Sequence, residues 1–239
     1  MARSKQPIKI TWLGHSAFHI ESPGGKSILI DPWIDNPKAP AGFSKDAKVD
    51  LILISHGHSD HIGNAVEIAR KSNANVLAIF ELYLYLRSQG VQNAIGMNKG
   101  GTIEVDGIHV SMVDAKHSCD IDVNGSVVAA GGEAAGFVIR FENGRSLYHA
   151  GDTSLFGDMK FIGKLYAPEI ALLPIGDLYT MGPREAAMAC ELLKPKTIIG
   201  MHYGTYPVLS GTPQMLKRYL HTKMKNRVVE LTPGVVFAC

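Results

Sequence analysis

The sequence has few cysteines and no long apolar run. Its three cysteines, Cys119, Cys190 and Cys239, are too few and too scattered for a disulfide framework, which favours a reducing compartment. Residues 1–9 are polar and basic, and the alternating residues after them do not supply the apolar segment of a signal peptide. No apolar run is long enough to span a membrane. We therefore expect a cytoplasmic protein.

Charged residues are also sparse. They make up 19% of the 239 residues, hydrophobic residues make up 46%, and the net charge is +2. This balance is ample to build the core of a compact protein, and no segment has the composition of a disordered region. Because the composition does not change along the chain, we expect a single domain over residues 1–239. A basic cluster in residues 217–227 favours a solvated helix face over a nucleic-acid site, so neither nucleic acid nor membrane is expected as a partner.

Histidine, in contrast, is concentrated in one short stretch. His56, His58, Asp60 and His61 place three imidazoles and a carboxylate within six residues, a density with few purely structural uses. The stretch follows an apolar, strand-like run, so it lies on a loop at a strand end. Residues two apart in an extended loop point the same way, so His56 and His58 could bind one cation while Asp60 and His61 turn towards a second. The alternative is a histidine-rich surface loop.

Two metal ions need ligands from elsewhere in the chain. His117, Asp152 and His202 each follow a further apolar, strand-like run, where such ligands are expected. The ordered set of His-x-His-x-Asp-His, a lone His, Gly-Asp-Thr and a final His resembles the metallo-β-lactamase superfamily of metal-dependent hydrolases over nearly the whole chain. Residues 12–18 and 30–33 further resemble the branch that includes ascorbate-6-phosphate lactonase and many uncharacterised hydrolases.

The resemblance implies a fold and a ligand set. The fold is a four-layer αββα sandwich with the metal site at one edge of the sheets, whereas periodicity alone indicates only an α/β protein. By the same resemblance two divalent ions are bound: one by His56, His58 and His117, the other by Asp60, His61 and His202, with Asp152 as the bridge. Nitrogen and oxygen ligands make zinc the first expectation, with manganese, iron or nickel as alternatives, and occupancy by one ion or two. Two such ions lower the pKa of a shared water and create a hydroxide nucleophile.

Other residues near the motifs have predicted roles. Asp60 and His15 are the candidate catalytic residues. His15 either polarises a substrate oxygen or protonates a leaving group, or else it is a histidine that supports the ligands or belongs to the core, held by backbone hydrogen bonds. Asp31 is expected to orient a ligand imidazole or the metal loop (residues 55–61), and His149 is expected to be a core histidine. Cys119, two residues from His117, is less favoured as a soft ligand or reactive thiol.

Periodicity and turn residues predict the strands and helices. Strands are predicted at residues 8–13, 17–21, 27–30, 51–54, 76–80, 102–105, 108–113, 136–141, 146–149, 170–173, 197–201, 228–231 and 235–238. Helices are predicted at residues 63–72, 81–89 and 183–193, around Ile162 and Leu165, and from Thr212, whose hydroxyl should cap its helix. The Gly- and Ala-rich residues 118–135 are predicted to be a mobile loop that acts as a lid.

These observations indicate a hydrolase that uses a metal-bound hydroxide on a small ester, lactone or phosphodiester. The alternative is a non-enzymatic metal-binding or ligand-sensing domain. Segments 177–184 and 203–207 should shape the pocket for a small-molecule substrate, and Arg184 either binds a phosphate or carboxylate or is solvated, with solvation favoured. A homo-oligomer is possible through the apolar residues 82–86, which core packing explains equally well.

Overall fold

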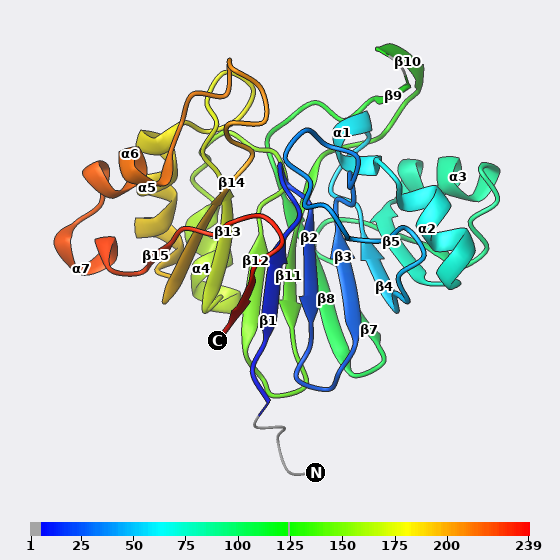
Figure 1. Ribbon diagram of the computed structural model, residues 1–239, viewed down its shortest axis with the longest axis horizontal. Helices are drawn as coiled ribbons and strands as arrows, with labels where there is room; N and C mark the ends of the chain where they lie inside the picture. The colour runs from blue at the N-terminus through cyan, green and yellow to red at the C-terminus, as the bar shows by residue number, and fades with distance from the viewer. Residues whose placement is uncertain (1–5, 124) are drawn as a thin grey trace.

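Two seven-stranded sheets pack face to face, and helices cover the outer face of each sheet (Figure 1). The computed structural model describes residues 6–123 and 125–239. Phe18 of one sheet contacts His149 of the other, with ring centroids 5.8 Å apart, and both side chains are fully buried. The core therefore lies between the sheets, and the predicted four-layer αββα sandwich is confirmed.

The first sheet has the order β16-β1-β2-β3-β4-β5-β6. Its strands are β1 (Lys9–Trp12), β2 (Phe18–Glu21), β3 (Ser27–Ile30), β4 (Leu51–Leu53), β5 (Asn75–Ile79), β6 (Ala94–Met97) and β16 (Val236–Ala238). The pairs from β16 to β3 are antiparallel, and those from β3 to β6 are parallel. All three residues of β4 are buried, as expected for an apolar run covered on both faces.

The second sheet has the order β15-β14-β13-β12-β11-β8-β7. Its strands are β7 (Thr102–Val105), β8 (Ile108–Asp114), β11 (Ala135–Arg140), β12 (Ser146–His149), β13 (Ile170–Pro174), β14 (Thr197–Met201) and β15 (Val228–Val229). The pairs from β7 to β12 are antiparallel, and those from β12 to β15 are parallel. Strands β8, β12 and β14 therefore end at the same edge, which is the upper edge in Figure 1.

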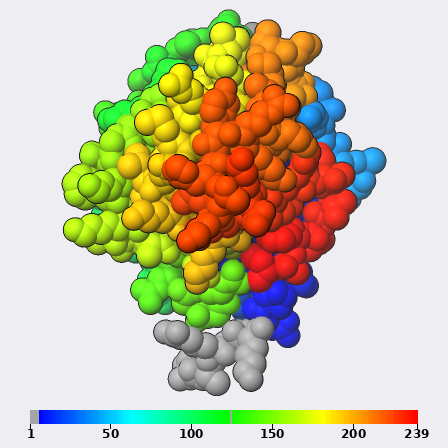
Figure 2. All heavy atoms as spheres, turned by 90° about the vertical axis from the view of Figure 1, so that its left-hand side faces the viewer, coloured from blue at the N-terminus to red at the C-terminus, as the bar shows by residue number. Residues whose placement is uncertain are grey.

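The helices form the two outer layers. They are α1 (Ser59–Ile62), α2 (Ala65–Ser72), α3 (Phe80–Ser88), α4 (Met159–Tyr166), α5 (Pro183–Leu193), α6 (Pro213–Tyr219) and α7 (Thr222–Lys225). Helices α2 and α3 flank the first sheet, α4 to α7 flank the second, and α6 and α7 occupy the middle of the side face in Figure 2. The Thr212 hydroxyl accepts a hydrogen bond from the Met215 amide at 3.1 Å, so the predicted cap is confirmed. Within the described residues, no helix has the length and apolar character needed to cross a membrane.

The predicted strands and helices are all present, most with ends shifted by one or two residues, but four features differ. The sequence analysis does not predict strand β6 or the short helices α1 and α7, and the loop prediction for residues 118–135 is wrong in part. That segment contains a hairpin of β9 (Ile121–Val123) and β10 (Ser126–Ala129), which projects above the site edge in Figure 1. The sequence carries a hairpin signal there, the pair Asn124-Gly125, which the Gly- and Ala-rich composition obscures.

Candidate metal centre

Three histidines from three parts of the chain form the first group of candidate ligands. His56 follows β4, His58 precedes α1, and His117 follows β8. One potential ligand atom from each lies within 4.8 Å of the others. His58 Nδ1 is 3.0 Å from His56 Nε2, whereas its Nε2 is 3.3 Å from Ser118 Oγ. Nδ1 is therefore the His58 atom that faces the centre.

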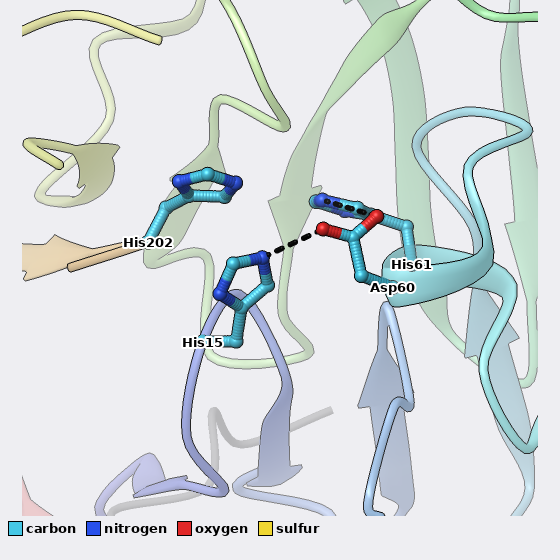
Figure 3. A group of neighbouring side chains, drawn as sticks. All are labelled: His15, Asp60, His61 and His202. Carbon is cyan, nitrogen blue, oxygen red and sulfur yellow. Dashed lines mark hydrogen bonds and ion pairs between the residues drawn. The ribbon is translucent and has the colours of Figure 1, made fainter. Parts of the chain in front are cut away.

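A second group, drawn in Figure 3, lies beside the first, since the ring centroids of His56 and His61 are 4.0 Å apart. It comprises Asp60 and His61 on α1, His202 after β14, and His15 in the loop between β1 and β2, with ligand atoms again within 4.8 Å of one another. The structure thus brings together the three residues that the resemblance assigned to a second ion. It adds His15 to them.

Asp152 lies between the two groups. Its Oδ2 is 2.9 Å from His202 Nε2, 3.2 Å from His61 Nε2 and 3.8 Å from His117 Nε2. Imidazoles of both groups therefore face one carboxylate oxygen. The resemblance assigned the bridging role to this residue.

The expectation of an extended metal loop is wrong after His58. The His58 carbonyl accepts hydrogen bonds from the amides of His61 and Ile62, which makes Ser59–Ile62 a single helical turn. Gly63 ends this turn with φ +44°, and a Cβ there would lie 2.4 Å from Trp33 Cα, so only glycine fits. The turn directs Asp60 and His61 to the second group, as predicted, but by helical rather than extended geometry.

Asp31 supports the site by hydrogen bonds to Ser55 and His61. Its carboxylate is fully buried and accepts hydrogen bonds from the Ser55 amide (2.7 Å), the Ser55 hydroxyl (2.7 Å) and His61 Nδ1 (2.8 Å). Because His61 Nδ1 is occupied, Nε2 is the atom left to face the centre. Asp31 therefore orients both a candidate ligand and the metal loop, as predicted.

The buried polar atoms fit a divalent cation. His61 Nε2 and Asp152 Oδ1 are buried and have no well-aligned hydrogen bond, an arrangement that is costly without a partner. Burial alone would raise the pKa of Asp152, but the surrounding His202 and His61 imidazoles lower it well below its usual range. Burial would lower the pKa of His61, but Asp152, Asp31 and Asp60 raise it well above its usual range. A cation could take the place of the His61 proton, and a cation could also supply the partner that Asp152 Oδ1 lacks.

His15 has both ring nitrogens occupied. Its Nε2 is 3.0 Å from Asp60 Oδ2, and its Nδ1 is 2.9 Å from Thr205 Oγ1. Burial would raise the pKa of Asp60, but His61 and His15 lower it, so the carboxylate is ionised and His15 Nε2 must donate. The imidazole is 1% exposed and does not line the cavity described below. These contacts favour the supporting role over the proton donor.

The backbone of His15 also contributes to the site. Its carbonyl accepts hydrogen bonds from the Trp12 indole at 2.8 Å and from the His202 amide at 3.0 Å. One residue thus connects the first sheet to ligands on α1 and after β14. His15 is best described as a positioning residue.

Two further residues near the site are structural. His149 Nε2 donates to the Ser16 carbonyl at 3.1 Å, and its Nδ1 accepts from the Gly151 amide at 3.1 Å, so the predicted core role is confirmed. The Cys119 thiol donates to the Gly131 carbonyl at 3.1 Å, and burial raises its pKa to about 11. A neutral, buried thiol does not support the ligand or nucleophile alternative for Cys119.

A cavity of about 650 Å³ opens over the ligands, a volume typical of a small-molecule site. Besides ligand side chains it is lined by Trp33, Ser59, Ser118, Asp122, Tyr179 and Tyr206. The predicted pocket segments contribute Tyr179 and Tyr206, whereas Ser59, Ser118 and Asp122 were not predicted as pocket residues. No sequence motif marks these three residues as pocket residues, because they line the cavity only once the hairpin packs against α1. Arg184 is exposed and does not line the cavity, so the solvated alternative holds.

The carboxylate of Asp122 bonds the hairpin to Ser59 of the metal loop and α1. Asp122 of β9 accepts hydrogen bonds from the Ser59 amide at 2.9 Å and the Ser59 hydroxyl at 2.7 Å. Gly57 lies so close to the chain before β9 that a Cβ there would be 2.2 Å from the Cys119 carbonyl oxygen. The base of the hairpin is therefore held against the ligands.

We predict that Asp122→Ala loosens this hairpin. Amide exchange in the β9 and β10 peptides, followed by mass spectrometry, should accelerate by roughly tenfold because bonds to a charged carboxylate are lost. The exposed Asp120 is a neighbouring carboxylate that does not line the cavity, so Asp120→Ala is the control and should leave exchange unchanged. Equal exchange in wild type and Asp122→Ala would show that other contacts hold the hairpin.

Comparisons with known proteins agree with this geometry. Residues 9–202 match a family described as "Beta-lactamase superfamily domain". A UPF0173 metal-dependent hydrolase of Koribacter versatilis is 53% identical over 230 residues, covering 96% of this chain and 97% of that protein. One from Methanosarcina barkeri is 48% identical over 228 residues, covering 95% and 96%. Igni18, a metallo hydrolase of the hyperthermophilic archaeon Ignicoccus hospitalis, superposes with a TM-score of 0.86 at 39% identity, over 98% of both chains.

The sequence motifs, the clustered ligands and these relatives point to one family. Their similarity extends over almost the full length of each chain, so it includes both sheets and every element that carries a candidate ligand. The chain therefore belongs to the β-lactamase superfamily, whose metallo-β-lactamase fold it has, and it is a metal-dependent hydrolase similar to the UPF0173 proteins.

Proposed function

We propose that the protein hydrolyses a small ester, lactone or phosphodiester at a centre of two divalent metal ions, with zinc as the first candidate. The observation that carries this proposal is the position of Asp152 Oδ2 between imidazoles of both groups. A carboxylate can bind one cation through each oxygen, and the second oxygen, Oδ1, is buried without a partner. The ligands would be His56, His58, Asp60, His61, His117, Asp152 and His202.

The residues of the chain prepare the site for this chemistry. When bound, the metal ions supply a Lewis acid for the scissile carbonyl or phosphoryl group and lower the pKa of a water molecule. Asp31 holds His61 in one orientation, and His15 holds Asp60, so the ligands need little rearrangement. Ser118 contacts His58, which we place among the ligands, so we assign it no role as a nucleophile.

Metal analysis combined with a substrate panel tests this proposal. Purified protein should contain zinc, manganese, iron or nickel, and it should turn over at least one member of a panel of simple esters, lactones and bis-nitrophenyl phosphate. Removal of the metal with a chelator should abolish the activity, and the same metal should restore it. A protein that holds metal but hydrolyses none of the panel would favour the non-enzymatic metal-binding or ligand-sensing alternative.

We further propose cytoplasm as the location, supported by three cysteines that are all free thiols. A homo-oligomer also stays a proposal. In the apolar residues 82–86, Leu82 and Leu86 are buried in the core, whereas Leu84 is half exposed. Core packing therefore explains only part of that stretch.

We predict that His15→Ala weakens metal binding and slows all substrates by a similar factor. Loss of a residue that orients a ligand typically lowers metal affinity by roughly 10–100-fold. Alkyl and nitrophenyl esters should therefore slow equally, and metal content should fall. Thr205→Val removes only the hydroxyl that contacts His15 Nδ1, so it should lower metal affinity and turnover less than His15→Ala does. If an alkyl ester slowed far more than the nitrophenyl ester at full metal content, His15 would be the proton donor instead.

A further inference from the structure

One wall of the cavity is aromatic. Trp33 and Tyr206 lie with ring centroids 6.2 Å apart and planes inclined by 28°, and Tyr179 lines the same cavity from the segment after β13. Tyr179 is 61% exposed and Tyr206 is 41% exposed, so both offer ring surface to a ligand. Aromatic faces of this kind bind flat, apolar groups by stacking or edge contacts.

The backbone that presents Tyr179 is strained. Asp177 and Leu178 have φ values of +70° and +59°, a left-handed conformation that is rare for leucine. The turn is held by hydrogen bonds from the Asp177 amide to the Met181 carbonyl (3.1 Å) and from the Leu178 amide to Asp177 Oδ1 (2.8 Å). The Met181 amide then bonds to the carbonyl of Thr153, the neighbour of Asp152. Strain that the surroundings maintain is typical of functional sites, and here it fixes an exposed ring beside the centre.

The cavity has no cationic side chain along its walls, as far as the described residues form them. Nearby lysines have other partners: Lys116 and Lys99 pair with Asp114, and Lys38 lies over the rings of Trp12 and Tyr203. Asp122 adds a negative charge to the wall, with both oxygens bonded to uncharged donors of Ser59. Proteins recognise phosphates and carboxylates mainly with Arg, Lys or clustered amides. An anionic group away from the metal ions would therefore meet no counter-charge here.

We propose that the natural substrate carries an aromatic or similarly flat apolar group and no anionic group other than the one that reacts. This inference rests on the proposed hydrolase function and specifies its substrate class. Trp33, Tyr179 and Tyr206 bind the flat group, while the carboxylate of Asp122 disfavours phosphorylated or carboxylated substrates. Cationic substituents are tolerated because the charge that Asp122 adds to the cavity wall is negative.

A matched substrate series tests the proposal. The series consists of γ-phenyl-γ-butyrolactone, its para-sulfonate and para-aminomethyl derivatives, and γ-methyl-γ-butyrolactone. If the substrate panel shows ester or phosphodiester cleavage instead, the same substituents are placed on benzyl acetate or on methyl benzyl phosphate. We expect kcat/KM for the phenyl compound to exceed that for the methyl compound and the sulfonate by about tenfold each. The aminomethyl compound should equal or exceed the phenyl compound. A sulfonate is the chosen anion because it binds metal ions weakly.

Variants of the aromatic wall provide the second readout. Tyr179→Ala and Tyr206→Ala should lower the phenyl-to-methyl ratio of kcat/KM at unchanged metal content. Tyr179→Lys places a cation at an exposed position and should raise the sulfonate-to-phenyl ratio by about tenfold. Tyr219→Lys on α6 is the control: Tyr219 is 54% exposed and outside the cavity, so the ratio should not change.

Binding without turnover separates this proposal from the proposed function. Dissociation constants of benzyl alcohol and its para-sulfonate for the metal-loaded protein can be measured by NMR titration, and the neutral alcohol should bind more tightly. Equal or tighter binding of the sulfonate, or a phenyl-to-methyl ratio unaffected by both alanine variants, would overturn the inference and leave the hydrolase intact. Absence of turnover throughout, with the neutral alcohol still preferred, would overturn the hydrolase function alone.

Discussion

Asp152→Ala is expected to remove bound metal and to lower kcat/KM by on the order of 10³-fold or more, because metal ions contribute several kcal/mol to hydrolysis. Asp152 Oδ2 faces His61, His117 and His202, so its removal takes away the anion shared by both ligand groups. The imidazoles that remain would be held close together without the charge that draws cations to them. Asp152→Asn keeps the size of the side chain and should show that the charge, rather than the volume, is required.

The measurement is metal content by elemental analysis, joined to kcat/KM and to a thermal unfolding scan. His58→Ala, on the far side of the centre, should give the same loss of metal. Asp158→Ala is the matched control, since this aspartate lies six residues further along the chain and is exposed. Full metal occupancy in both Asp152→Ala and His58→Ala would refute the ligand assignment.

Asp31→Ala is expected to combine a loss of metal affinity with a loss of stability. The affinity should fall by roughly 10–100-fold because His61 loses the partner that fixes its orientation. The free energy of unfolding should fall by roughly 3 kcal/mol, because three donors on Ser55 and His61 lose their buried acceptor. Asparagine tolerates the φ of +47° at this position, so Asp31→Asn keeps the backbone but weakens acceptance from His61.

Calorimetric metal titration and urea unfolding measure these two effects separately. Asp50→Asn is the control, because Asp50 also accepts a hydrogen bond from a backbone amide, that of Ser27, but at the opposite end of β3 and β4. It should change stability slightly and metal affinity not at all. Unchanged metal affinity in Asp31→Ala would mean that the metal loop holds His61 without this carboxylate.

Much of the fold could be predicted from local sequence. Apolar runs such as Leu51–Leu53 can be recognised because a strand buried on both faces needs apolar side chains at every position. The helix that begins after Thr212 could be placed because its cap and its first-turn proline are adjacent in the chain. Local sequence does not reveal the hairpin β9–β10 because its strands are only three and four residues long and its anchor, Ser59, is far away in sequence.

The candidate ligands could also be identified from the sequence. Each lies directly after a strand-like run or in the histidine-rich stretch that follows one, and only a few side-chain types bind metal ions. The resemblance of their order to that of the metallo-β-lactamase superfamily implied both groups and the shared aspartate. His15 was ambiguous for the opposite reason. Whether its imidazole meets substrate or Asp60 depends on the distance between the loop after β1 and helix α1, which sequence spacing does not specify.

Local sequence was enough for most of the strands and helices and for the candidate ligands, since these follow from side-chain type and from periodicity over a few residues, and the family resemblance indicated the class of chemistry. Three further features depend on tertiary packing: His15 supports Asp60, Asp122 bonds the hairpin to α1, and three aromatic rings line a cavity without cationic side chains among the described residues. Each of these depends on contacts between segments far apart in the chain. Such contacts arise only when the two sheets pack and bring the ends of their strands to one edge.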